Sequence, residues 1–128
     1  MRILICGDRN YVDWRHIIKS FIESLPKDSV IIQGGCRGAD LLAKSEAKRN
    51  NLEVIEFPAD WKAYGKAAGH IRNRQMLDEG KPDIVIAFHE NIQNSRGTLN
   101  MLTQSRVYNI PTYLNPDDFN KIEEFVYE

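Results

Sequence analysis

Glycines and charged side chains follow the short apolar runs of this sequence in an arrangement that could bind a phosphate group. The densest such segment is Gly34-Gly35-Cys36-Arg37-Gly38-Ala39-Asp40. Glycine lets the backbone adopt turns closed to other residues and approach a ligand closely. A helix that begins at Gly38 would also present free N–H groups and a partial positive charge to an anion. We therefore favour a phosphate, ribose or backbone-contact role over an ordinary glycine turn.

A second segment of this kind is Ser95-Arg96-Gly97-Thr98. Gly97 would admit a phosphate, the two hydroxyls could bind it, and Arg96 could add charge-assisted hydrogen bonds. The alternative is an ordinary helix cap, in which Ser95 or Thr98 satisfies the first N–H groups of a helix. Taken alone, this segment leaves both interpretations open.

The segment from Gly65 to Arg74 carries three basic residues, Lys66, Arg72 and Arg74, together with Asn73. Their spacing prevents the three from sharing one helix face, so we expect one or two to point into a site. Glycine lowers helix stability by about 1 kcal/mol relative to alanine, and this segment contains two. We therefore favour a binding role, with a solvated surface helix as the alternative.

Three carboxylates, Asp8, Asp40 and Asp60, stand beside these segments. They could bind ribose hydroxyls, pair with arginines or act in acid–base chemistry. Asp40 and Arg72 are the candidate catalytic residues, whereas capping or ion pairing is favoured for Asp60. Trp61 could stack on a base or simply pack. Cys36 could form a thiolate near a helix start, but no histidine is near it in sequence, so a catalytic cysteine is not favoured.

Apolar runs alternate with amphipathic stretches along the whole chain. Strands are expected at 2–6, 30–32, 52–57, 84–88 and 112–114, and helices at 13–25, 38–50, 66–79, 98–107 and from 117 onward. This alternation predicts an α/β, Rossmann-like three-layer fold: a five-stranded, mostly parallel sheet with helices on both faces, in one domain of residues 1–128. Ligands of such sheets bind beyond the carboxyl ends of the strands, where the strand order reverses.

The apolar faces of two helices are less regular. Leu99, Leu102 and Val107 are expected to form the core face of the helix at 98–107. The helix at 66–79 has only a weak stripe, formed by Ala67, Ala68, Ile71, Met76 and Leu77. One face of that helix is therefore expected to meet something polar.

The composition narrows the class of protein. The 128 residues are 42% hydrophobic and 27% charged, which is typical of a globular domain, and the net charge of −1 counts against a duplex-binding surface. No apolar run approaches the roughly 20 residues that span a bilayer.

The N-terminal residues predict a first strand, not a signal peptide, so Cys6 and Cys36 are expected to be reduced in a cytoplasmic protein. The scattered His16, His70 and His89 predict no metal site, and no cofactor is expected.

Taken in order, these segments resemble the YspA/YpsA-related (YAcAr) branch of the SLOG superfamily. The resemblance covers about residues 2–115 and is carried by Gly7-Asp8-Arg9, the two glycine segments, Phe57-Pro58-Ala59-Asp60-Trp61 and residues 65–76 with Arg72-Asn73-Arg74-Gln75-Met76. The superfamily also holds the lonely-guy phosphoribohydrolases and the Smf/DprA-type DNA-processing proteins. The resemblance implies a Rossmann-like sheet and a nucleotide-derived ligand.

From the residues and the resemblance together, the candidate ligand-binding set is Gly7, Asp8, Arg9, Gly34, Gly35, Gly38, Ala39, Asp40, Lys66, Arg72, Asn73, Ser95, Arg96, Gly97 and Thr98. One departure from the resemblance matters. The phosphoribohydrolases place a glutamate important for N-glycosidic cleavage three residues after their Gly-Thr threonine, and here that position is Met101. A thioether cannot replace a carboxylate, so their activity is not transferred, although Asp40 or Asp8 could supply a carboxylate from elsewhere.

Three functions follow from these features. We expect binding or sensing of a nucleotide or nucleotide-derived ligand. The alternative is a hydrolase or transferase that cuts a nucleotide at an N-glycosidic or phosphate bond. A weaker alternative is single-stranded nucleic-acid binding by Arg9, Arg37, Lys66, Arg72 and Arg74, against which we count the near-neutral charge and the lack of clustered exposed aromatic residues. A homodimer is also open, because Tyr108, Tyr113, Phe119 and Phe125 could supply apolar surface or pack in the core.

Overall fold

Five parallel strands form the centre of the fold in a computed structural model that describes residues 1–9 and 15–122. The strands are β1 (Arg2–Gly7), β2 (Val30–Gln33), β3 (Glu53–Glu56), β4 (Ile84–Phe88) and β5 (Thr112–Leu114). They are arranged in the order β3-β2-β1-β4-β5, and all four neighbouring pairs are parallel. The predicted α/β, Rossmann-like fold is confirmed.

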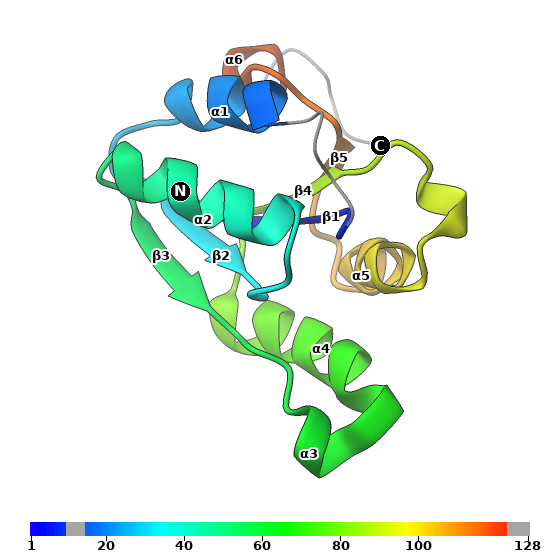
Figure 1. The fold of residues 1–128 in the computed structure, drawn as a ribbon. Helices are drawn as coiled ribbons and strands as arrows, with labels where there is room; N and C mark the ends of the chain where they lie inside the picture. The colour runs from blue at the N-terminus through cyan, green and yellow to red at the C-terminus, as the bar shows by residue number, and fades with distance from the viewer. Residues whose placement is uncertain (10–14, 123–128) are drawn as a thin grey trace.

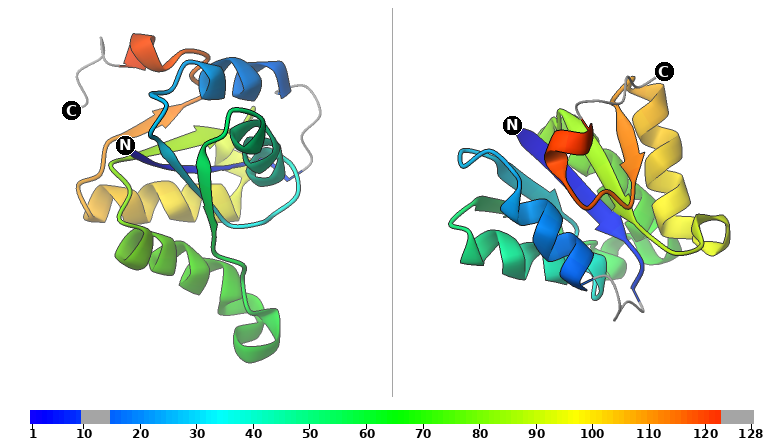
Figure 2. Two further views of the ribbon diagram at one scale, coloured as in Figure 1. Left: turned by 90° about the vertical axis from the view of Figure 1, so that its left-hand side faces the viewer. Right: turned by 90° about the horizontal axis from the view of Figure 1, so that it is seen from above.

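Helices cover both faces of this sheet. Helices α1 (Arg15–Glu23), α2 (Ala39–Arg49) and α6 (Phe119–Ile122) lie on one face, and α4 (Ala68–Gly80) and α5 (Arg96–Val107) lie on the other, as Figures 1 and 2 show. The short helix α3 (Trp61–Tyr64) and the 3-10 turn η1 (Gly65–Ala67) extend α4 away from the sheet (Figure 1). A second 3-10 turn, η2 (Ile92–Asn94), precedes α5.

Two apolar clusters fill the space between these layers. Because successive side chains of a strand point to opposite faces, Ile3 and Ile5 of β1 join the cluster under α1 and α2, whereas Leu4 and Cys6 join the cluster under α4 and α5. The nearly unbroken apolar runs of β1, β2 and β4 are therefore explained by burial on both sides. Strand β3 is an edge strand, and its terminal residues Glu53 and Glu56 are exposed.

The predicted core face of α5 is right at Leu102, which packs half-buried against the cluster under α4 and α5, and wrong at Leu99 and Val107. Thr98, Met101 and Ser105 are the buried residues of this helix, whereas Leu99 is 42% and Val107 75% exposed. Ser105 can lie inward because its hydroxyl has local partners. The Ser105 hydroxyl bonds the Leu102 carbonyl oxygen and the Thr112 hydroxyl, both at 3.0 Å. In α4, Ile71 is likewise exposed rather than part of the core face.

Helix α3 is an element that hydrophobic periodicity did not predict. It begins after Asp60, whose side chain caps it by accepting the Ala63 N–H at 3.0 Å, so the favoured capping role of Asp60 is confirmed. The helix expected from Lys66 begins instead at Ala68, after η1. Asp13, Trp14, Phe125 and Val126, placed above in the first and last helices, lie outside the described residues.

The aromatic residues considered for a dimer surface are divided between core and surface. Phe119 is buried, and Tyr113 packs half-buried against the same cluster. Tyr108 stays at the surface, where its hydroxyl donates to Asp78. Among the described residues, no helix is long and apolar enough to cross a membrane.

The strand order creates one reversal, at β1. The chain moves outward from β1 to β2 and β3, then returns to the other side of β1 with β4 and β5. Strands β1 and β4 run in register from Ile3 beside Ile84 to Gly7 beside Phe88. The loops that leave these two strands therefore separate at the same edge of the sheet and leave a crevice there.

The loop after β1 docks closely on the start of α2. The Asp8 carbonyl oxygen accepts the Ala39 N–H at 3.0 Å. Gly38 adopts a left-handed φ of 81°, and a Cβ atom at this position would overlap the Asp8 carbonyl oxygen. Only glycine satisfies both requirements without moving one of the two loops.

Gly38→Ala is therefore expected to destabilise the fold by about 2 kcal/mol or more, because it adds a clash to a strained φ. Gly97→Ala is the matched control, since a Cβ there meets nothing within 4 Å and the residue is helical. The control is expected to leave stability unchanged or raise it by up to about 1 kcal/mol. Urea denaturation midpoints measure both. Equal midpoints would contradict the docking role of Gly38.

Candidate ligand-binding site

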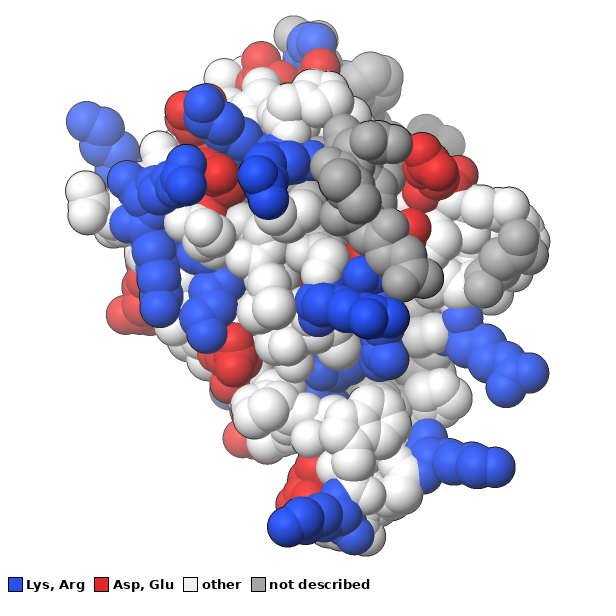
Figure 3. Space-filling model, in the orientation of Figure 1, with Lys and Arg blue, Asp and Glu red and all other residues white. Residues whose placement is uncertain are grey.

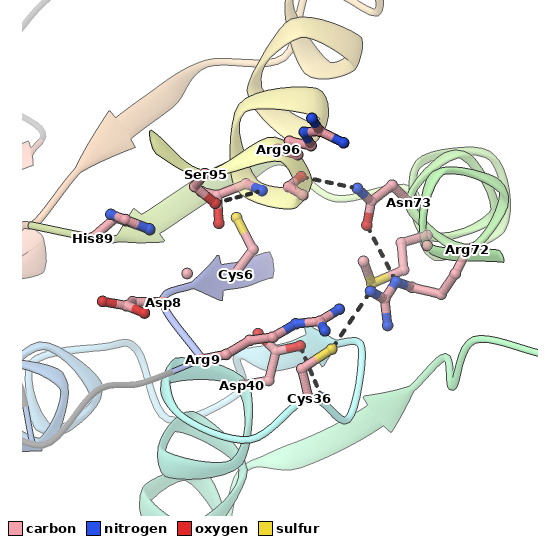
Figure 4. A pocket seen from close by; sticks show the side chains of 15 residues that line it. Cys6, Asp8, Arg9, Cys36, Asp40, Arg72, Asn73, His89, Ser95 and Arg96 are labelled. Atoms are coloured by element: carbon pink, nitrogen blue, oxygen red, sulfur yellow. Dashed lines mark hydrogen bonds between the residues drawn. The ribbon is translucent and has the colours of Figure 1, made fainter. Parts of the chain in front are cut away.

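A cavity of about 300 Å³ opens beyond the carboxyl ends of β1 and β4 (Figure 4). Its walls come from the loop after β1, the start of α2, one face of α4, and the loop and first turn of α5. The lining residues are Cys6, Gly7, Asp8, Arg9, Cys36, Asp40, Gly69, Arg72, Asn73, Met76, His89, Ser95, Arg96, Gly97 and Thr98. The cavity therefore lies at the reversal of strand order, where the fold class predicts a ligand.

Helix α4 turns one regular face toward the cavity. Gly69, Arg72, Asn73 and Met76 are spaced by three, four and seven residues from the first, so they lie on one side of a helix. This face explains the weak apolar stripe, because its middle is polar. Of the three basic residues considered in this segment, only Arg72 lines the cavity; Lys66 and Arg74 are exposed elsewhere.

Arg72 is buried, and its guanidinium joins α4 to the loop after β2. Its Nη1 donates to the Gly34 carbonyl oxygen at 2.7 Å, and its Nη2 donates to the Cys36 Sγ at 3.6 Å. Its Nε donates to Asn73 Oδ1 at 3.2 Å. A Cβ at Gly34 would overlap Nη1, so the glycine makes room for this side chain.

Asn73 extends the same network to α5. Its Nδ2 donates to the Gly97 carbonyl oxygen at 3.2 Å and to Asn100 Oδ1 at 3.1 Å. Gln104 supports Asn100 by donating to the same Oδ1 at 2.7 Å. The first turn of α5 is therefore held at a fixed position relative to Arg72.

Asp40 is a buried carboxyl group at the floor of the cavity. Its Oδ2 accepts the N–H groups of Gly34 at 3.1 Å and Cys36 at 3.3 Å. Burial raises the pKa of Asp40 from 3.8 to about 6, although Arg72, the two amide hydrogen bonds and Arg9 act in the opposite direction. Both the acid and the carboxylate form of Asp40 are therefore populated around pH 6.

The glycine segment after β2 has a different role from the direct contact that the sequence predicts. Gly34, Gly35, Gly38 and Ala39 do not line the cavity. Three of their N–H groups bond within the protein: Gly34 donates to Asp40 Oδ2, Gly35 to Gln33 Oε1 at 2.6 Å, and Ala39 to the Asp8 carbonyl oxygen. The N–H group of Ala39 is therefore not free to bind a ligand. This segment positions Asp40 and Arg72, which do face the cavity.

The start of α5 remains open to the cavity. Ser95 caps the helix by accepting the Thr98 N–H at 3.2 Å, so the capping interpretation of this segment is confirmed. The first N–H groups of a helix have no partner within it, and those of Arg96 and Gly97 precede the capped residue. A Cβ at Gly97 would meet nothing within 4 Å. The N-terminus of α5 therefore adjoins free space. A helix cap does not need such space, whereas a bound ligand does.

Five lining residues were not among the candidates: Cys6, Cys36, Gly69, Met76 and His89. His89 directly follows β4, so the rule that placed Asp8 after β1 could have found it. Its Nδ1 accepts the Asn91 N–H at 2.9 Å, which leaves the proton of the neutral ring on Nε2. Cys6 donates to the Ile86 carbonyl oxygen at 3.7 Å, and burial raises the pKa of its thiol, so it stays protonated.

The charge around the cavity is positive on balance. Three arginines line it, Arg9, Arg72 and Arg96, against two carboxyl groups, Asp8 and Asp40. Figure 3 shows basic side chains gathered in the region that Figure 1 shows bounded by α2, α4 and α5. Within the described ranges, no three potential metal ligands come together.

Met101 lies in the core under α5 and is fully buried. It packs against the sheet and does not line the cavity. The position at which the resemblance places a hydrolytic glutamate is thus part of the apolar core in this chain.

One expectation about the surface needs correction. Trp61 and Tyr64, both on α3, are 51% and 53% exposed. Exposed aromatic residues therefore do cluster, and this ground against single-stranded nucleic-acid binding does not hold.

Comparison with known proteins identifies the family. The YspA, cpYpsA-related SLOG family (YAcAr) matches residues 1–64. The Gene 61 protein of Mycobacterium phage D29 is 31% identical over 118 residues, which cover 86% of this chain and 92% of that protein. The chain belongs to the YspA, cpYpsA-related SLOG family.

A solved structure shares the fold. The X-ray structure of DNA processing protein A (DprA) from Streptococcus pneumoniae is similar with a TM-score of 0.56 and 15% identity. The match covers 99% of this chain but only 62% of that one, so this chain spans less than two thirds of that protein's length. At this level of identity the structural match shows a shared fold.

The raised pKa of Asp40 predicts how stability depends on pH. Between about pH 3.8 and 6 the folded state binds this proton and the unfolded state does not, so the stability from protonated Asp40 is full below pH 3.8 and is lost as the pH rises through 6. Asp40→Asn stays neutral and keeps an oxygen for the two amides. Relative to this variant, the wild type should lose about 3 kcal/mol of unfolding free energy between pH 3.5 and 7.5. Chemical denaturation at both pH values measures this, and a constant difference would contradict the assignment.

Proposed function

We propose that the cavity binds a nucleotide or nucleotide-derived molecule in the cytoplasm, with a phosphate at the N-terminus of α5. The observation that carries the proposal is the open space at Gly97. Glycine at this position lets a phosphate reach the N–H groups of Arg96 and Gly97 and the positive end of the helix dipole. The expectation of a cytoplasmic protein rests on the free cysteines Cys6 and Cys36.

The buried arginine supports an anionic ligand. The three hydrogen bonds of Arg72 go to a carbonyl oxygen, an amide oxygen and a sulfur atom. A guanidinium has five N–H donors, so it can still donate to a ligand that enters the cavity. An anion there would offset the burial of the cation, and Arg9 at the rim would add charge-assisted hydrogen bonds.

The size of the cavity favours a small ligand. About 300 Å³ is at the lower end of small-molecule sites, which suits a mononucleotide-sized group. Ribose hydroxyls could bond Asp8, Asp40 or the Nε2 of His89, all of which line the cavity. The cavity therefore offers donors for phosphate together with polar partners for ribose hydroxyls.

The proposal is tested by thermal unfolding with AMP, ADP-ribose and 3′,5′-cyclic AMP. A ligand at 100 times its dissociation constant stabilises the folded state by about 2.7 kcal/mol, which raises the Tm of a domain of this size by about 10 °C. Gly97→Val should abolish this rise, because its side chain occupies the open space beside the helix start, where a Cβ meets no atom within 4 Å. Thr103→Val, on an exposed part of the same helix, should keep it. Wild-type protein that no nucleotide stabilises would refute the proposal.

A second candidate function is hydrolysis of the bound nucleotide. It is favoured by Asp40, a buried carboxyl group whose pKa of about 6 suits a general acid. Protonated Asp40 could protonate the leaving base as water attacks the sugar carbon of an N-glycosidic bond. Arg72, beside it in the cavity, would hold the ligand's phosphate.

Chromatography of AMP incubated with the protein measures release of adenine. Asp40→Asn should lower the rate at least about 100-fold while AMP still raises the Tm, because general acid catalysis contributes about 10²–10⁴ in rate. Adenine release that is equal in the variant would exclude Asp40 as the acid. If the wild type binds AMP and releases no adenine, the domain acts by binding alone.

A further inference from the structure

Trp61 stands at the rim of the cavity, and its indole is half exposed. It belongs to α3, which the Asp60 cap holds in place. The indole lies near Gly69, since a Cβ added at Gly69 would be 3.7 Å from the far edge of the ring. Gly69 is the outermost lining residue of α4, and Trp61 therefore continues the wall of the cavity outward.

Arg9 lies over the indole ring. Its guanidinium carbon lies 6.0 Å from the ring centroid, near the outer limit of a cation–π contact. Arg9 also lines the cavity and is itself exposed. This contact is weak enough for the guanidinium to move to a stronger partner such as a phosphate.

The neighbouring aromatic residue does not share this placement. Tyr64 is on the same helix and is equally exposed. The ring that lies near Gly69 and under the Arg9 guanidinium is that of Trp61. Single exposed aromatic side chains are common on protein surfaces. The contacts with two lining residues distinguish Trp61 from such a case.

We infer that Trp61 is the stacking surface for the base of the ligand, which makes the ligand a base-bearing nucleotide, not a sugar phosphate. This inference rests on the proposed function. Gly69, beside the indole, and Asn73, bonded to the Gly97 carbonyl, are four residues apart on α4, a rise of about 6 Å. A ribose can bridge that separation, with the base on Trp61 and the phosphate at Gly97. Arg9 then leaves the indole and binds the phosphate.

Affinity for AMP and for ribose 5-phosphate, measured by calorimetry, separates the base from the rest of the ligand. Trp61→Ala should weaken AMP binding about tenfold or more, since base–aromatic stacking contributes about that much per base. It should leave the affinity for ribose 5-phosphate unchanged. Trp61→Phe should recover most of the AMP affinity, and the matched control Tyr64→Ala should behave as the wild type.

A spectroscopic signal reports the same contact directly. The chain has two tryptophans, Trp14 and Trp61, so Trp14→Phe leaves Trp61 as the only indole. AMP should quench the fluorescence of this variant, because a base would stack on the remaining ring. Ribose 5-phosphate should not quench it.

The outcomes separate the inference from the proposed function. If AMP binds equally to wild type and Trp61→Ala but not to Gly97→Val, the stacking inference is overturned and phosphate binding stands. If no nucleotide binds the wild type, both are overturned. If only an oligonucleotide binds, and Trp61→Ala and Tyr64→Ala weaken it alike, α3 is a nucleic-acid surface and the inference is likewise overturned.

Discussion

The buried guanidinium of Arg72 fixes the relation between the two halves of this site. It bonds the Gly34 carbonyl oxygen after β2, the Cys36 sulfur and the neighbouring Asn73, which in turn bonds the Gly97 carbonyl at the start of α5. A buried cation is stable only where such partners surround it, so the loop after β2, the lining face of α4 and the first turn of α5 must keep their relative positions. The glycine at position 34 is part of this requirement, because no other residue leaves room for the guanidinium.

This constraint gives the two glycine-rich helix starts different roles. The start of α2 is closed, since Ala39 donates to the loop after β1 and the amides before the helix hold Gln33 and Asp40. The start of α5 is open, with Ser95 satisfying one amide and Gly97 facing free space. One loop therefore positions the charged side chains and the other offers backbone donors. A small anionic ligand, such as a nucleotide, can use both the charged side chains and the backbone donors.

Much of this arrangement could be predicted from the sequence. Unbroken apolar runs are typical of strands covered on both faces, and the reversal rule depends only on strand order, so Asp8 and Arg9 after β1 and Ser95–Thr98 after β4 were found without coordinates, although His89 was not. The role of Gly34 could not be found, because it depends on Arg72, 38 residues later in the chain. The core face of α5 was predicted only in part, since the residues buried there include the polar Thr98 and Ser105, and the Ser105 hydroxyl has a local partner. Lys66 was included because nothing in the periodicity indicated that a 3-10 turn precedes α4.

The central claim is that phosphate binds at the open start of α5, and NMR observes that site directly. In an AMP titration of ¹⁵N-labelled protein, the account predicts that the largest amide shift changes occur at Arg96, Gly97 and Thr98, with smaller changes at Asp8 and Gly69 around the same cavity. Saturating shifts confined to other surfaces, such as the ion pair of Lys44 with Glu56 between α2 and β3, would place the ligand elsewhere and contradict the account.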